Sequence, residues 1–184
     1  MYSPQIVCFC DIPLEDFYLH TQKYTRFGFS FSKDFIVAQG GTPVLYLPES
    51  AAVGSRGRGS SSDAERVRLA DHFDEMVMQY QAAMEPLPSL IKKQYGQPGV
   101  PPAVNQLMEV KRFIDFKLLS MIKFFDHTLP DDHAANYYLE REWRVIGNVQ
   151  FQLLDVRRIL IPSDFARRLR VDLPEYEGQL SFLD

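Results

Sequence analysis

The sequence has few cysteines and no long apolar run. Its two cysteines, Cys8 and Cys10, are only two residues apart on a strand-like stretch, too close for an ordinary structural disulfide. No segment approaches the roughly 20 apolar residues of a membrane-spanning helix, and the first residues lack the basic and apolar regions of a signal peptide. These absences predict a reduced, cytoplasmic protein with no membrane partner.

Basic residues are outnumbered by acidic residues overall, but arginines are concentrated in one part of the chain. The 184 residues carry 20 Lys and Arg against 24 Asp and Glu, and the net charge of −4 argues against a general nucleic-acid-binding protein. Arginines nevertheless gather between residues 141 and 170. Such a patch suits an acidic protein partner, a phosphate or a nucleic-acid strand, although no nucleic-acid-reading motif occurs. The arginines that we predict to bind a partner are Arg157, Arg158, Arg167, Arg168 and Arg170.

Hydrophobic periodicity predicts strands near both ends of the chain and helices between them. Strands are expected at 5–12, 26–32, 43–47, 140–146 and 156–161. Residues 14–24 are expected to form a short helix or a tight connection, and short helices are expected from Ser32 as N-cap to Val37 and at 165–170.

The middle of the chain differs in character. Residues 49–62 are rich in Gly and Ser, which predicts a flexible loop. Asp63 then caps a long amphipathic helix, and a second helix is expected at 103–115, while 116–125 fits either its continuation or a strand. We therefore expect a single α+β domain over residues 1–184, with a mixed, mainly antiparallel sheet. A helical insertion at about 63–125 would pack on one face of that sheet.

Two polar segments carry the candidate site. Glu140, Glu142 and Arg144 would share one face of the predicted 140–146 strand. Acidic residues are poor strand formers, and such local conflicts are frequent at functional sites. A structural ion pair of Glu142 with Arg144 or Arg141 is the alternative. The other segment holds His20, able to act as acid or base, and Tyr24, able to stack on a flat ring. A histidine that anchors a turn through backbone hydrogen bonds is the alternative for His20.

Motifs for metals and nucleotides are missing. No histidine pair has zinc-ligand spacing, so no metal site is expected. The sequence also lacks a dinucleotide fingerprint, a Walker lysine and a Gly-x-Ser-x-Gly elbow.

Five blocks in order give the chain a family resemblance. They are CFCDIPL at 8–14, H-x-x-x-Y at 20–24, FGFSFSK at 27–33, GGTPVLYL at 40–47 and YYLEREWR at 137–144. Together they resemble the AbiGi family of antitoxins from bacterial abortive phage-resistance systems. The resemblance implies a protein that restrains a cognate toxin, or regulates another defence protein, by direct contact. Its contact surface would be the arginine patch or the flexible loop, and no cofactor is expected.

A second resemblance gives an alternative. The order of a strand, an H-x-x-x-Y block and a late glutamate is similar to ADP-ribosyltransferase-like folds, which implies an enzyme that uses NAD. By that resemblance Glu142 is the catalytic carboxylate, His20 holds the ribose and Tyr24 stacks near nicotinamide. Arg144, Lys33 and Glu140 are then the candidate ligand-binding residues.

Overall fold

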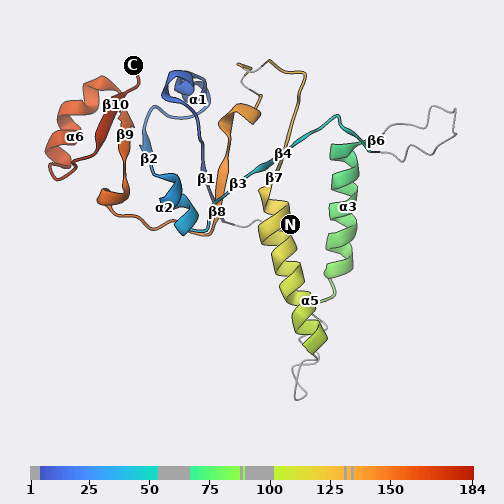
Figure 1. Cartoon of the computed structure of the whole chain (residues 1–184). Coiled ribbons are helices and arrows are strands. Elements are labelled where there is room, and N and C mark those ends of the chain that lie inside the picture. The colour runs from blue at the N-terminus through green and yellow to red at the C-terminus, as the bar shows by residue number, and fades with distance from the viewer. Residues whose placement is uncertain (1–4, 54–66, 88, 90–101, 131, 134) are drawn as a thin grey trace. The chain divides into compact units, whose positions relative to one another are not determined.

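The computed structural model describes residues 5–53, 67–87, 89, 102–130, 132–133 and 135–184 (Figure 1). It forms two compact units, one of Met1–Val44 with Pro130–Asp184 and one of Leu45–Leu129. Helices and mostly antiparallel strands occur together, which confirms the α+β class. The expectation of a single domain stays a prediction. No described helix is long and apolar enough to span a membrane.

The first unit contains a sheet built around β8 (Trp143–Ile146). β1 (Ile6–Phe9) and β3 (Thr42–Pro43) both pair antiparallel with β8, in the order β1-β8-β3. Val145 at the centre is 1% exposed, as expected of a β-branched residue on the inner face of a sheet. Cys8 and Thr42 lie opposite Arg144 from either side, so the register places this arginine between two strands.

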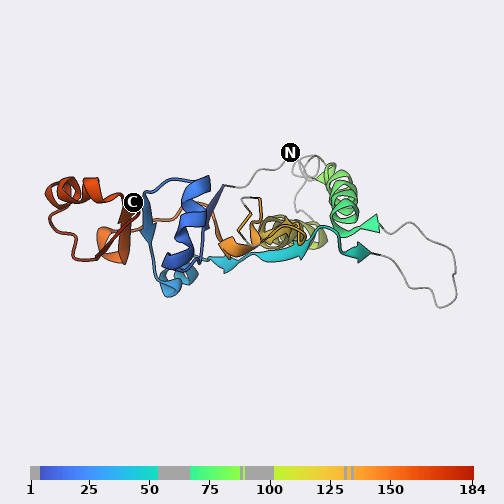
Figure 2. The same ribbon diagram turned by 90° about the horizontal axis from the view of Figure 1, so that it is seen from above.

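The second sheet of this unit has the order β10-β9-β2 (Figures 1 and 2). Its central strand β9 (Arg158–Ile161) pairs parallel with β10 (Gln179–Phe182) and antiparallel with β2 (Gly28–Ser30). Three successive apolar residues of β9 are buried, Ile159, Leu160 and Ile161. Helix α6 (Ala166–Asp172) packs Leu169 and the following Leu173 against this core, which also contains Val156 and Tyr176.

Two short helices connect β1, β2 and β3. A 3-10 helix at Leu14–Asp16 leads into α1 (Phe17–Lys23), and α2 (Lys33–Ala38) follows β2. The predicted cap of α2 is confirmed, because the Ser32 hydroxyl accepts a hydrogen bond of 3.1 Å from the Phe35 amide.

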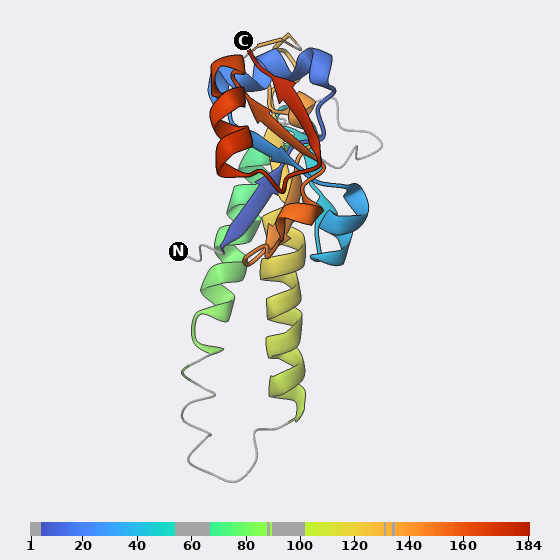
Figure 3. The ribbon, with the colours of Figure 1, turned by 90° about the vertical axis from the view of Figure 1, so that its left-hand side faces the viewer.

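The second unit pairs two long helices with short strands. β4 (Leu45–Pro48) runs parallel to β7 (Ile122–Phe125), and β5 (Ala52–Val53) runs antiparallel to β6 (Val67–Arg68). Helices α3 (Leu69–Met84) and α5 (Pro102–Phe113) lie side by side (Figure 3). The Tyr80 hydroxyl links them by donating to Asp115, at 3.0 Å, in the π-helix Ile114–Leu118 that follows α5. A 3-10 helix at Leu119–Met121 then leads into β7.

The prediction of one strand over 140–146 is wrong in its first half. Tyr138–Glu140 forms a 3-10 helix, and Arg141 has a left-handed backbone with φ of 43°. The strand therefore begins only at Trp143, and Glu140 does not share a strand face with Glu142 and Arg144. A left-handed residue bends the backbone out of the extended conformation, so the alternation of side chains along a strand stops there.

Other boundaries also differ from the prediction. The expected 43–47 strand divides into β3 and β4, and the predicted 49–62 loop contains β5. The 116–125 run is helical at first and becomes a strand at Ile122. β10 was not predicted, and residues 54–66, with the proposed Asp63 cap, lie outside the described part of the chain.

Two adjacent glycines between α2 and β3 give a test of this fold. A Cβ on Gly41 would lie 2.4 Å from Ile36 Cγ2 and 2.7 Å from the Ile36 carbonyl oxygen. We expect Gly41→Ala to lower the free energy of unfolding by about 3 kcal/mol, because backbone must move. Gly40 has φ of 80° but open space around it, so Gly40→Ala should cost only about 1 kcal/mol. Urea unfolding followed by fluorescence of Trp143 measures both, and equal losses would contradict this packing.

Candidate functional site

The end of α1 presents three polar side chains to the same neighbourhood. His20, Lys23 and Tyr24 are three and four residues apart, the spacing that places side chains on one helix face. The His20 ring lies against Tyr24, with centroids 4.4 Å apart and planes inclined by 30°. Phe17 contacts the imidazole as well, at 5.0 Å. The H-x-x-x-Y block is therefore one packed aromatic cluster.

Glu140 is the carboxylate that this cluster holds. It is 7% exposed, and it accepts a hydrogen bond of 3.2 Å from the Tyr24 hydroxyl. Lys23 Nζ lies 3.5 Å from the same oxygen and 4.5 Å from the centroid of the Tyr137 ring. A buried carboxylate requires such partners, since an unpaired charge would be costly. These contacts fasten α1 to the 3-10 helix at Tyr138–Glu140.

His20 is packed so that its neutral form is favoured. Burial is the main cause that lowers the pKa of His20, Lys23 acts in the same direction, and the charge of Glu140 opposes them. Nε2 lies 4.0 Å from Cys10 Sγ. Among the described residues, buried Nδ1 has no hydrogen-bond partner. A small cavity of about 20 Å³ lined by His20, Lys23 and Glu140 adjoins it, enough for about one water molecule.

Glu142 and Arg144 form a buried, bidentate ion pair. The Arg144 Nε donates to one carboxylate oxygen at 2.7 Å and its terminal nitrogen donates to the other at 3.3 Å. Glu142 is 5% exposed. Cys8, opposite Arg144, is an exposed residue, but partial desolvation of its thiol and the Glu142 carboxylate raise its pKa to about 11. The fork fixes the orientation of the Glu142 carboxylate, and it is the ion pair that the sequence offered as the alternative to a catalytic role.

The other predicted site residues are dispersed. Lys33, at the start of α2, pairs with Asp11 at 2.7 Å on the surface. In the arginine patch, Arg158 donates to Ser181 at 2.7 Å, Arg168 pairs with Asp172 at 3.2 Å, and Arg170 donates to the Tyr176 carbonyl at 3.1 Å. Arg157 and Arg167 have exposed side chains. The predicted arginines therefore lie at the start of β9 and on α6, and several of them are held by neighbouring groups of the same unit.

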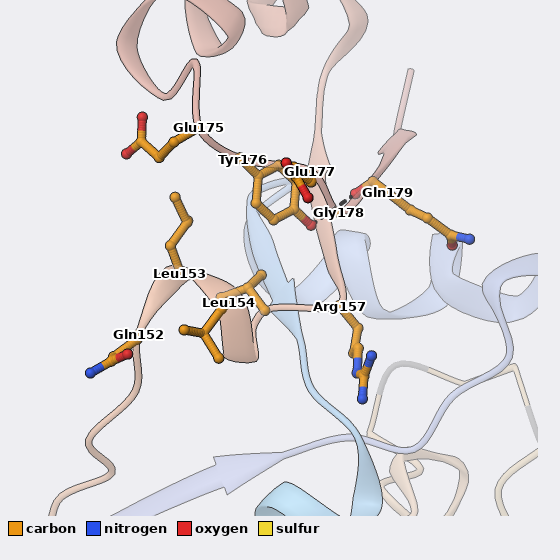
Figure 4. A pocket seen from close by; sticks show the side chains of 10 residues that line it. Gln152, Leu153, Leu154, Arg157, Glu175, Tyr176, Glu177, Gly178 and Gln179 are labelled. Carbon is orange, nitrogen blue, oxygen red and sulfur yellow. Dashed lines mark hydrogen bonds between the residues drawn. The ribbon is translucent and has the colours of Figure 1, made fainter.

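Arg157 also borders a depression of about 740 Å³ (Figure 4). One side is the 152–154 segment and the other the 175–179 turn. In Figure 4 Leu153 extends toward Glu175, whereas Arg157 points away from that glutamate. The Tyr176 hydroxyl donates to the Gln179 carbonyl at 3.1 Å and so braces the turn. Leucines, glutamates and one arginine on these walls select no single ligand class.

A family profile matches residues 2–167 and is described as "Putative abortive phage resistance protein AbiGi, antitoxin". The match spans both units and includes every residue of the His20 and Glu142 clusters. The chain belongs to the AbiGi family. The family predicted from the five sequence blocks is thereby confirmed, and AbiGi membership implies an antitoxin-like role in phage resistance with a toxin as partner. No curated protein and no solved structure matches this AbiGi chain.

Three residues of this cluster were not among the predicted site residues, although each lies within one of the five sequence blocks. Lys23 pairs with Glu140 and lies over the Tyr137 ring, and Cys10 Sγ lies against His20. Lys23 could have been found from its helical spacing to His20, whereas the contacts of Tyr137 and Cys10 come from tertiary packing. Across the described ranges, no group of three or more His, Cys, Asp or Glu side chains is arranged to hold a metal ion.

The Glu142–Arg144 pair predicts a measurable coupling. Glu142→Gln leaves a largely buried guanidinium without its counter-charge, so we expect a loss of about 3 kcal/mol in unfolding free energy. The double variant with Arg144→Gln should lose less than the sum of the single variants. Asp172→Asn, which breaks the exposed Arg168–Asp172 pair, is the control and should change stability by less than about 0.5 kcal/mol.

The same variant tests the NAD-dependent alternative, which stays a prediction. Calorimetric titration with NAD should show saturable binding to the native chain, weakened in Glu142→Gln, if Glu142 serves a nucleotide site. A native chain that binds no NAD, together with a destabilised Glu142→Gln, identifies the residue as a structural member of the ion pair.

Burial of His20 predicts a pH dependence of stability. Its pKa is below the ordinary value of 6.5 in the folded chain, so the unfolded chain binds more protons in the window below pH 6.5. The stability from neutral His20 is full above that window and is lost as the pH falls through it. Urea unfolding at pH 7.5 and 5.5 should show a smaller loss in His20→Gln than in the native chain. Equal losses would contradict the burial, since the other titrating groups are shared.

Proposed function

We propose that this AbiGi chain acts as an antitoxin by binding its toxin directly, through the surface formed by α6 and the β10-β9-β2 sheet. The family match carries the proposal, because an antitoxin needs a toxin as its target. Protein interfaces are enriched in aromatic residues and arginine. Both kinds of residue are exposed on this part of the first unit.

The charges of α6 favour an acidic partner surface. The segment Ser163–Asp172 carries Arg167, Arg168 and Arg170 against two aspartates, in a chain of net charge −4. The Arg168 side chain is 77% exposed even though it pairs with Asp172. An exposed pair of this kind contributes little to stability, so a carboxylate of the partner can replace Asp172 at small cost.

The interior clusters support an interaction role in a different way. Glu140 and Glu142 are both buried, and their contacts with Lys23, Tyr24 and Arg144 hold strands and helices of the first unit together. A rigid scaffold of this kind presents its outer surface in one conformation. Pre-organisation of that kind lowers the entropic cost of binding.

The test is co-expression with the protein encoded beside this chain, followed by affinity purification. We expect a stable complex, and relief of the growth arrest that the partner causes alone. Arg167→Glu with Arg168→Glu should weaken the complex by about tenfold or more, because like charges then face the acidic partner.

The matched control is Arg112→Glu on α5, since Arg112 is also an exposed helical arginine in an ion pair, with Glu109 at 2.9 Å. It should leave the complex intact. Failure of the native pair to associate would refute the proposed function. Binding of DNA with a steep salt dependence, in place of the protein, would identify a nucleic-acid partner instead.

A further inference from the structure

The first unit contains an apolar groove between α6 and β2. Its volume is about 370 Å³, at the lower end of the range of about 300–1,000 Å³ typical of ligand pockets. Ile159 and Ile161, both nearly fully buried, form its floor. Its walls are Phe27 and Phe29 on one side and Phe165, Leu169 and Leu173 on the other. We call it the α6–β2 groove.

The groove exists because α6 covers only part of the sheet face. Phe29 and Leu180 both lie opposite Ile159 in the ladder, so the three side chains share one face. Leu180 and Leu169 pack into the core beside Ile159. Phe29, on the other side of β9, remains 53% exposed, and Phe27 and Phe165 are 48% and 42% exposed. A contiguous group of exposed apolar side chains marks an interaction site, and aromatic residues around a pocket are the usual anchors of protein interfaces.

One wall of the groove also carries charge. Phe165, Arg168, Leu169, Asp172 and Leu173 repeat at three- and four-residue intervals, and all five line the groove. Arg168 therefore lies on the groove side of the helix, next to the phenylalanines. Its guanidinium is held by Asp172 at 3.2 Å and is open to solvent. A ligand that fills the groove thus meets an arginine at its rim.

We propose that the α6–β2 groove receives one bulky apolar side chain of the toxin, flanked by a carboxylate that pairs with Arg168. The inference rests on the proposed function, and it names the chemistry of the partner segment. Phe27, Phe29 and Phe165 bury the apolar side chain. The arginines of α6 select the acidic neighbour, which sets the register of the partner on the helix. A purely apolar partner would leave Arg168 without that contact.

The probe is the protein encoded beside this chain, titrated against purified native and variant chains. Phe29→Asp introduces a charge into the groove and should weaken binding by about 30-fold or more, the effect of losing an anchor residue. Phe113→Asp is the matched control, because Phe113 is 56% exposed at the end of α5 in the second unit and does not line the groove. It should leave affinity within about threefold, as expected for a peripheral position.

A second variant from a different element protects the test against misfolding. Phe165→Asp, on the 3-10 helix before α6 (Ser163–Phe165), should weaken binding as Phe29→Asp does. Trp143 fluorescence and thermal unfolding check that each variant retains its fold. Arg168→Glu should also reduce affinity for the native partner. It should cause no such reduction for a partner variant in which the flanking carboxylate has been replaced.

The outcomes separate the two proposals. If the native chain does not bind the probe, the proposed function fails and the groove assignment fails with it. If the native chain binds and Phe29→Asp and Phe165→Asp bind equally well, only the groove assignment is overturned. A chain that self-associates through Phe29, shown by light scattering, would make a second copy the occupant and also overturn it.

Discussion

Two buried carboxylates on either side of the left-handed residue Arg141 hold the first unit together. Glu140 pairs with Lys23 of α1 and accepts a hydrogen bond from the hydroxyl of Tyr24, the residue after that helix, whereas Glu142 pairs with Arg144 of β8. Two backbone hydrogen bonds add to these side-chain contacts. The Glu140 carbonyl accepts a hydrogen bond from the Asp11 amide, and the Glu142 carbonyl accepts one from the Val44 amide. One three-residue segment thus fixes the ends of β1 and β3 and the position of α1. The fold depends on these pairs, since either charge alone would be costly in the interior.

In the first unit, the buried polar side chains are hydrogen-bonded or paired with one another, whereas phenylalanines and arginines are exposed on its surface. The polar residues that attract attention in the sequence, His20, Tyr24 and Glu142, contact neighbouring side chains of the same unit. The half-exposed Phe29 lies on the second sheet of that unit, and Phe165 and the α6 arginines lie on the helical segment beside it. The proposed toxin-binding surface includes the α6–β2 groove, which combines apolar and cationic side chains. The buried ion pairs and the proposed anchor site can occur within one small unit, because they lie on different sheets.

Local patterns were sufficient for some elements because the decisive interactions are local. Ser32 caps α2 through an amide three residues away, and the apolar run of β9 is buried on both faces of its sheet. The Glu142–Arg144 pair was also foreseen, as an alternative, from two-residue spacing alone. In contrast, β10 has an unremarkable sequence, Gln-Leu-Ser-Phe, and it becomes a strand only because β9 offers it a parallel edge. Strand pairing over a distance in sequence cannot be inferred from one short segment.

The sequence by itself determined the α+β class and the family, and it identified His20, Tyr24, Glu140, Glu142 and Arg144 as candidate polar residues. Periodicity and motif order are properties of the chain and require no knowledge of contacts. Only the tertiary structure decided how those residues are partnered. It turned the chain at Arg141, assigned Tyr24 to Glu140 and Arg144 to Glu142, and left Phe29 uncovered beside α6. The physical reason is that a buried charge pairs with whichever counter-charge the packing brings within a few ångströms. That packing is set by contacts between residues more than a hundred positions apart, such as Tyr24 and Glu140.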